Sequence, residues 1–303
     1  MYASYVSYMR LGIVHCMAFP SAGGDTRVLM DSMRRIALDP FFQSIEITHI
    51  ADPDLRKQVK QMLALAKVSV GFAAQPLVLG GGLNINSLDE DVRARSVASL
   101  KGFLDEAKEM GAETFEILSG KDPGPESRGR AVQALVDSLK ELCQYSREIG
   151  GPTIVAEVFD CEIDKCALLG PAAMAARVGG EVASSYNNFG LLVDLSHIPL
   201  LGESPAQALQ PVKDYLHQVH LGNAVVEKGM PGHGDQHPAF GTPGGVNDVP
   251  ELAEFLKELF NIGFLGGERS PLVGFEIKPM EGQDPELVIA NAKRVFNQAW
   301  ALL

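Results

Sequence analysis

The sequence has few cysteines, a deficit of basic residues and no long apolar run. Its four cysteines form no CxxC pair, so we expect reduced thiols in a cytoplasmic protein rather than a disulfide framework. No apolar run approaches the roughly 18 residues that a membrane span needs, so we expect no membrane partner. Lysine and arginine total 26 against 38 acidic residues, a net charge of −12. This acidity argues against a nucleic-acid partner, because phosphate binding needs a basic face.

The chain also lacks the features of a signal peptide at its start and a dinucleotide-binding motif elsewhere. The segment MYASYVSY has no basic start of the kind a signal peptide carries. We expect these residues, 1–8, to be a disordered extension before the first strand. No GxGxxG follows any apolar run, which argues against a dinucleotide-binding fold.

Short apolar runs alternate with helical periodicity along the whole chain. The first run covers 10–19 and the eighth covers 272–279, and helical spacing of apolar residues follows each of them. This alternation predicts a parallel sheet. Eight units in 303 residues, with no linker-like stretch, favour a single α/β domain over residues 1–303, a (β/α)8 TIM barrel.

Several local signals refine this prediction. Asp52 and Pro53 predict the start of a helix, and Gly111 predicts the end of another. The segment 164–180 is expected to be helical in two pieces because Pro171 interrupts it. The stretch 224–247 has no periodicity and is rich in Gly, Pro and His. A loop of that length inside a compact domain is usually functional.

Four successive strand-like runs in the second half each end near one side chain that can bind a metal. A charged residue that closes a buried run is costly unless it is paired or binds a cation. The carboxyl ends of barrel strands meet at one face, so we expect the four side chains to converge. They are Glu157, Asp194, His220 and Glu276.

This set of residues is suited to a catalytic divalent ion. Three hard oxygen donors and one imidazole fit Mn²⁺, Mg²⁺, Co²⁺ or Zn²⁺ with positions left for water or substrate. Three carboxylates that meet in a barrel mouth would repel one another unless a cation held them together. The alternative is that each residue makes an ordinary ion pair or caps a helix. His15, His49, Glu46 and Lys278 also lie near strand ends, where an ordinary structural role is at least as good an interpretation.

Such a site can start several reactions in the same way. A divalent ion that chelates a carbonyl and its neighbouring hydroxyl acidifies the C–H bond beside the carbonyl. A carboxylate can remove that proton, and a second carboxylic acid can return one. Return to the opposite face is epimerisation, return to the next carbon is isomerisation, and loss of a leaving group is a lyase reaction.

The set Glu157, Asp194, His220 and Glu276 on strands five to eight resembles that of the xylose-isomerase-like TIM barrels. This superfamily includes D-tagatose 3-epimerases, inosose dehydratase and endonuclease IV. The resemblance implies that the four residues bind one metal ion, Mn²⁺ by preference, and that Glu157 and Glu276 act as an acid–base pair. The DxxH spacing of Asp194 and His197 also matches, and it implies that His197 holds substrate oxygens.

The sequence departs from the sugar epimerases after His220. Those enzymes carry an arginine shortly after this histidine, whereas LGNAVV follows it here. The loop instead offers HGDQHP, and its Asp235 and His237 resemble a zinc-binding pair of endonuclease IV. That enzyme needs further histidines after strands three and four, where FAAQP and EILSG stand here. We therefore interpret Asp235 and His237 as substrate-binding or lid residues.

The sequence thus predicts a metal-dependent isomerase or epimerase that acts on a sugar or polyol carbonyl. The first alternative is a lyase of the same superfamily, either a dehydratase or the barrel subunit of a C-glycoside deglycosidase that acts on a 3-oxo-glycoside. A zinc phosphodiesterase similar to endonuclease IV and a non-catalytic barrel are further alternatives. The sequence leaves open whether the chain forms a homo-oligomer or requires a partner subunit.

Overall fold

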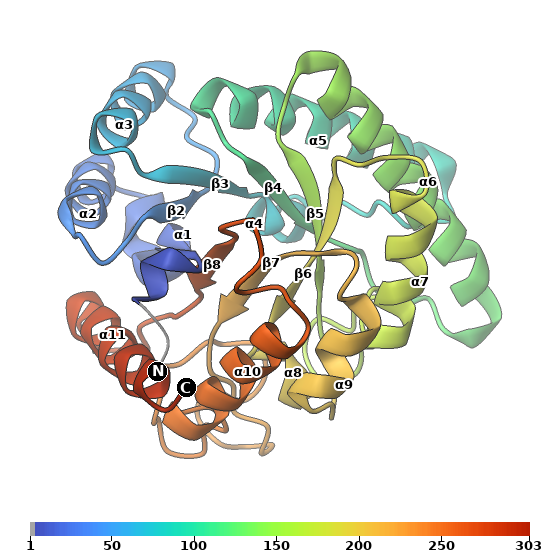
Figure 1. The fold of residues 1–303 in the computed structure, drawn as a ribbon. Coiled ribbons are helices and arrows are strands. Elements are labelled where there is room, and N and C mark those ends of the chain that lie inside the picture. Colours follow the sequence, from blue (N-terminus) through green and yellow to red (C-terminus); the bar gives the residue numbers. More distant parts are fainter. Residues whose placement is uncertain (1–3) are drawn as a thin grey trace.

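The computed structural model describes residues 4–303 and confirms the (β/α)8 barrel as a single domain (Figure 1). Every pairing between neighbouring strands is parallel, in the order β1-β8-β7-β6-β5-β4-β3-β2. The strands are β1 (Arg10–Ile13), β2 (Ser44–Ile47), β3 (Ser69–Ala73), β4 (Thr114–Leu118), β5 (Thr153–Val158), β6 (Phe189–Asp194), β7 (Leu216–Leu221) and β8 (Leu272–Phe275).

The barrel closes between β1 and β2 through only a few contacts. Val14, just beyond β1, forms an isolated parallel bridge with Glu46. The backbone N–H of Gln43 donates a 2.8 Å hydrogen bond to the carbonyl oxygen of Leu11. The pairing of β1 with β2 is therefore weaker than the pairing of the other neighbouring strands.

The longer helices form an outer ring around the strands (Figure 1). Three short helices, α1, α4 and α8, begin within three residues of the ends of β1, β3 and β6. The helices are α1 (His15–Ala18), α2 (Thr26–Leu38), α3 (Pro53–Ala66), α4 (Gln75–Gly80), α5 (Glu90–Met110), α6 (Pro125–Ile149), α7 (Ala172–Ala183), α8 (His197–Leu200), α9 (Pro205–Leu209), α10 (Val249–Asn261) and α11 (Pro285–Ala301). No helix among residues 4–303 is long and apolar enough to cross a membrane.

The predicted helix boundaries at Asp52 and Gly111 are confirmed. The Asp52 carboxylate accepts hydrogen bonds from the backbone N–H groups of Asp54 and Leu55, and Pro53 occupies the first turn, where its missing N–H costs nothing. Gly111 ends α5 with φ of 76°, a left-handed conformation that glycine adopts without strain.

The prediction of two helical pieces over 164–180 is wrong in its first half. Residues 164–171 are irregular, with several bends and with Ala167 in an isolated bridge to Lys121, and α7 begins only after Pro171. The first strand is also shorter than the apolar run 10–19, because α1 begins at His15. Apolar content alone does not separate a buried strand from a buried turn of helix.

The expectation of a disordered extension over residues 1–8 needs correction. Residues 1–3 lie outside the described residues, but Tyr5–Ser7 forms a 3-10 helix. The Tyr5 ring packs edge-on against Phe296 of α11 with ring centroids 5.3 Å apart, and its hydroxyl donates to the carbonyl oxygen of Phe41. Aromatic packing therefore fixes residues 5–7 against the barrel. Trp300 packs in the same aromatic cluster, and its ring centroid lies 5.9 Å from that of Phe296.

Candidate metal centre and active site

The structure brings the four sequence-predicted metal ligands together at the carboxyl end of the barrel. Glu157 lies on β5, Asp194 ends β6, His220 lies on β7 and Glu276 directly follows β8. One potential ligand atom from each residue lies within 4.8 Å of the other three. Because parallel strands carry these residues to one face, side chains far apart in sequence share a single site.

The Nδ1 atom of His220 lies among the three carboxylates. It is 2.7 Å from Oε2 of Glu276, 3.8 Å from Oε1 of Glu157 and 3.8 Å from Oδ2 of Asp194. The side chains of Glu157, Asp194 and His220 are at most 1% exposed, and that of Glu276 is 13% exposed. The site is therefore enclosed on three sides and opens to solvent beside Glu276.

Each of two buried carboxylates has one oxygen held and one oxygen without a hydrogen bond. Gln75 Nε2 donates a 2.7 Å hydrogen bond to Oε2 of Glu157, and the Ser196 N–H donates a 2.6 Å bond to Oδ1 of Asp194. Oε1 of Glu157 and Oδ2 of Asp194 are buried with no hydrogen-bond partner in residues 4–303. Leaving such oxygens unpaired is costly. Both face His220 Nδ1, so the donor set fits a divalent cation.

The electrostatics of the four residues show the same crowding of negative charge. Burial, followed by repulsion from Glu276, raises the pKa of Glu157 to about 8. Burial also raises the pKa of Asp194. Although burial opposes it, attraction to His237 and His220 lowers the pKa of Glu276 to about 2. The pKa values of the two glutamates therefore shift in opposite directions.

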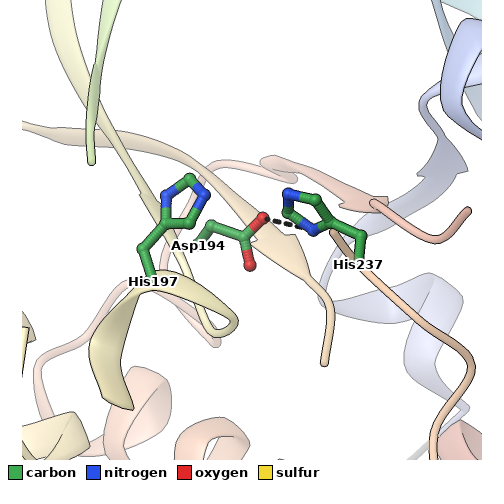
Figure 2. Close-up of side chains that lie close together, drawn as sticks. All are labelled: Asp194, His197 and His237. Atoms are coloured by element: carbon green, nitrogen blue, oxygen red, sulfur yellow. Dashed lines mark ion pairs between the residues drawn. The ribbon is translucent and has the colours of Figure 1, made fainter. Parts of the chain in front are cut away.

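His197, Asp235 and His237 lie directly beside this set. Figure 2 shows Asp194 between the rings of His197 and His237, and Oδ2 of Asp194 is 3.8 Å from Nδ1 of His237. The loop 224–247 therefore reaches the site, although it contains no long element. His237 adopts φ of 49°, a strained conformation that places its ring against the carboxylates.

Asp235 joins three cationic side chains into one buried network. Its Oδ1 lies 3.0 Å from Nε2 of His197 and 2.6 Å from Nε2 of His237, and its Oδ2 lies 2.7 Å from Nζ of Lys165. Burial alone would raise the pKa of Asp235, but the two histidines hold it well below its usual value. Burial opposes protonation of His237, yet Glu276 and Asp235 raise its pKa to about 9.

Asp194, His197 and His237 form a second group that could hold a metal ion. In the structure, however, both ring nitrogens of His197 have other partners. Its Nδ1 lies 2.8 Å from the carbonyl oxygen of Val158 and its Nε2 contacts Asp235. A metal at this group would require His197 to give up one of these bonds. In the four-residue set the corresponding contact joins Nδ1 of His220 to Oε2 of Glu276, and both atoms belong to proposed ligands.

Sequence reasoning missed Gln75 and Lys165 at this site. Gln75 lies just beyond β3, and a polar residue that closes an apolar run was a signal available at that position. Lys165 lies in the irregular segment 164–171, which was expected to be helical, and no sequence pattern indicated a role for it at the site. The sequence did not reveal either residue, because each reaches the site through a contact with a residue more than 60 positions away.

The other polar residues near strand ends divide into two kinds. His15 Nε2 lies 2.8 Å from the Ser32 hydroxyl, and His49 Nδ1 lies 2.5 Å from Glu106, so both make local structural contacts. Glu46 lies inside the barrel and contacts His220. Lys278 lines the cavity of the site together with Glu276.

A cavity of about 260 Å³ opens above Glu276. One part of its wall is apolar and the other carries amide, ammonium and carboxylate groups. This mixture, and a volume near the lower end for ligand pockets, suit a small polar molecule. The lining includes Val14, Met17, Leu79, Phe159, Gln75, Lys165, Asp235, Gln236, Glu276 and Lys278.

Several solved structures of low sequence identity share this fold. A D-tagatose 3-epimerase-like protein is 19% identical with a TM-score of 0.71, covering 96% of this chain and 98% of that chain. A 3-keto-D-glucoside 4-epimerase from E. coli is 17% identical with a TM-score of 0.69, over 95% of this chain and 99% of the other. The IolI protein, solved with a zinc atom, is 17% identical with a TM-score of 0.69, over 96% and 98%.

The sequence itself matches a family model, whereas no curated protein sequence matches it. The model described as xylose isomerase-like TIM barrel covers residues 39–298. That range includes every strand except β1 and all four residues of the convergent set. The chain therefore belongs to the xylose isomerase-like TIM barrel family.

Proposed function

We propose that this protein is a divalent-metal-dependent isomerase or epimerase that acts on a sugar or a related polyol carbonyl. The observation that carries the proposal is the convergence of Glu157, Asp194, His220 and Glu276 below a small cavity with both apolar and polar walls. The epimerases of similar fold agree with it. We further propose that the enzyme is cytoplasmic.

These four residues would hold the ion, with Mn²⁺ preferred because three of the donors are hard carboxylate oxygens. When bound, the ion would polarise the substrate carbonyl and acidify the neighbouring C–H bond. Gln75 and the Ser196 N–H each hold one oxygen of a ligand carboxylate, which leaves the other oxygen directed at the centre. The protein thereby fixes the ligand geometry before anything binds.

Glu157 and Glu276 are the proposed acid–base pair. Before a metal binds, burial and repulsion from Glu276 raise the pKa of Glu157, whereas attraction to His237 and His220 lowers that of Glu276, so the two carboxyl groups differ in proton affinity. One carboxylate would remove the substrate proton while the other carboxylic acid supplies one. Glu276 borders the cavity, which gives it access to substrate carbon.

His197, Asp235 and His237 are proposed to hold substrate oxygens. Although burial opposes it, Asp235 raises the pKa of His197, and Glu276 and Asp235 raise that of His237. Nδ1 of His237 has no hydrogen-bond partner among residues 4–303, so it can donate to a substrate hydroxyl or carbonyl group. His197 would do so by exchanging one of its present bonds. Lys278 adds a further ammonium donor at the cavity wall. These donors would orient one face of the substrate toward the carboxylates.

A lyase reaction is the second candidate. The protonated His237, 3.5 Å from Oε1 of Glu276, could give a proton to a departing group after the same first step. Elimination, unlike epimerisation, changes the composition of the product, so product analysis separates the two. A requirement for a second protein chain would also favour the lyase.

The test is incubation of the Mn²⁺-loaded protein with a panel of ketoses and 3-oxo-glycosides in D₂O. We expect one substrate to gain deuterium at the carbon beside its carbonyl and to yield an epimer or isomer. A product that has lost a leaving group would establish the lyase. Deuterium exchange in no member of the panel would contradict both candidates for those substrates. Binding of two or three zinc ions would instead favour a phosphodiesterase.

A further inference from the structure

The second ring nitrogen of His220 faces the inside of the barrel, away from the metal ligands. Its Nε2 atom lies 2.7 Å from Oε2 of Glu46. Glu46 is on β2, is 2% exposed and is separated from His220 by 174 positions in the sequence. The same nitrogen lies 3.5 Å from Nε2 of Gln218.

We propose that Glu46 is a positioning residue that holds His220 so that Nδ1 presents its lone pair to the metal. The inference rests on the proposed metal-dependent function. Glu46 would not touch the ion or the substrate. It would act through one hydrogen bond from Nε2–H of His220, on the opposite side of the ring from the ligand atom.

The two distances decide which tautomer this environment favours. A carboxylate accepts hydrogen bonds, so contact with Glu46 requires a proton on Nε2. The amide nitrogen of Gln218 is a donor and would require a bare Nε2. The Glu46 contact is 0.8 Å shorter (3.5 − 2.7 Å), so it prevails. Nδ1 lies 2.7 Å from Oε2 of Glu276, which is itself a proposed ligand, so a bound ion would take the place of the proton between these two atoms.

Two glycines make the space that Glu46 occupies. A Cβ atom at Gly274 would lie 2.2 Å from Oε1 of Glu46. A Cβ atom at Gly71 would lie 2.8 Å from Cγ of Glu46 and 2.8 Å from Oε1 of Glu116. Any larger residue at either position would displace the carboxylate. The carboxylate thus lies in a fitted niche below His220.

Such an arrangement tunes metal binding. A histidine ligand commonly donates its other ring N–H to a carboxylate, which fixes the ring and raises its basicity. Loss of such a partner typically costs 10- to 100-fold in metal affinity. The alternative is that Glu46 only neutralises a buried histidine and thereby stabilises the barrel, with no effect on the ligand nitrogen.

Glu116 provides a matched control for this alternative. Glu116 is fully buried inside the same barrel and, like Glu46, lies next to Gly71. Its Oε1 accepts a 2.5 Å hydrogen bond from the Thr114 hydroxyl. No hydrogen bond joins it to His220 among residues 4–303. A change at Glu116 therefore perturbs the buried acidic layer without removing a hydrogen bond from the ligand, and glutamine keeps the size of the side chain.

The experiment titrates Co²⁺ into metal-free wild type, Glu46→Ala, Glu46→Gln and Glu116→Gln, and follows the visible absorption of the bound ion. We expect Glu46→Ala to bind about 10- to 100-fold more weakly with an altered spectrum. Glu46→Gln should recover part of the affinity, because the amide oxygen still accepts from Nε2–H. Glu116→Gln should match the wild type in both readouts. Circular dichroism checks that each variant is folded.

The outcomes separate this proposal from the proposed function. Wild-type protein that binds neither Co²⁺, Mn²⁺ nor Zn²⁺ would overturn both. Tight, spectrally unchanged Co²⁺ binding by Glu46→Ala would overturn the positioning role and leave the metal site intact. If Glu46→Ala does not fold, Glu46→Gln decides, and an affinity equal to that of Glu116→Gln would overturn the role.

Discussion

Gln75 donates a 2.7 Å hydrogen bond from Nε2 to Oε2 of Glu157, which leaves Oε1 of this glutamate free. A neutral amide can orient a carboxylate without adding a charge to the site. We expect Gln75→Leu to retain the metal but to lower kcat by about 10- to 100-fold, because Glu157 loses its fixed direction. Metal content and steady-state kinetics measure the two effects. Gln236→Leu changes another glutamine of the same cavity and should have a smaller effect on kcat.

Metal removal provides the second prediction. Protein purified without chelator should contain about one Mn, Co, Mg or Zn per chain, and Asp194→Ala should lose it, because Asp194 is buried and supplies an unpaired oxygen to the centre. Elemental analysis of both proteins measures this. A chelator should lower the Tm of the wild type, since an ion bound only to the folded state stabilises it. Retention of the metal by Asp194→Ala would exclude this assignment.

Replacement of Glu276 tests the acid–base pair. Glu276→Gln keeps the size of the side chain but cannot accept the substrate proton, so we expect turnover and deuterium exchange from D₂O to fall by at least about 100-fold. Metal binding should weaken and yet be recoverable at high metal concentration. Exchange kinetics at saturating Mn²⁺ measure the chemical step alone. If Glu276→Gln exchanged deuterium at the rate of the wild type, another group would be the base.

Asp235→Asn removes the negative charge that joins His197, His237 and Lys165. Breaking a buried ion pair by removal of one partner costs roughly 3–5 kcal/mol, so we expect a large loss of unfolding free energy at pH 7. Urea denaturation measures it. The control is Asp164→Asn, because Asp164 is 31% exposed and lies 3.4 Å from Lys165. An equal, small effect of both substitutions would contradict the role of Asp235.

His15 should make stability depend on pH. Burial lowers its pKa from 6.5 to about 4, so between these values the unfolded chain binds a proton that the folded protein does not. Stability therefore rises with pH through this window and is lost as the pH falls. When the pH falls from 7 to 5, we expect the free energy of unfolding of His15→Gln to decrease by about 2 kcal/mol less than that of the wild type. Urea denaturation at both pH values measures the difference.

The alternation of apolar runs was sufficient to predict the barrel, and the polar ends of strands five to eight were sufficient to predict the convergent set. Both follow from rules that hold along one strand and its neighbours. The contribution of Lys165 could not be predicted, because it comes from an irregular segment whose path depends on packing. The contact of Glu46 with His220 was also hidden, since it crosses the interior between β2 and β7. Local sequence does not determine which inward side chains meet across a barrel.

Glu46 is also the residue at which the barrel closes, through its bridge to Val14. If its carboxylate holds the metal-binding histidine, then closure of the strand ring and occupancy of the centre are linked equilibria. A bound ion would protect the amides of β1 and β2 from hydrogen exchange, although neither strand supplies a ligand. Conversely, a substitution that loosens this junction would weaken metal binding from the opposite side of the barrel.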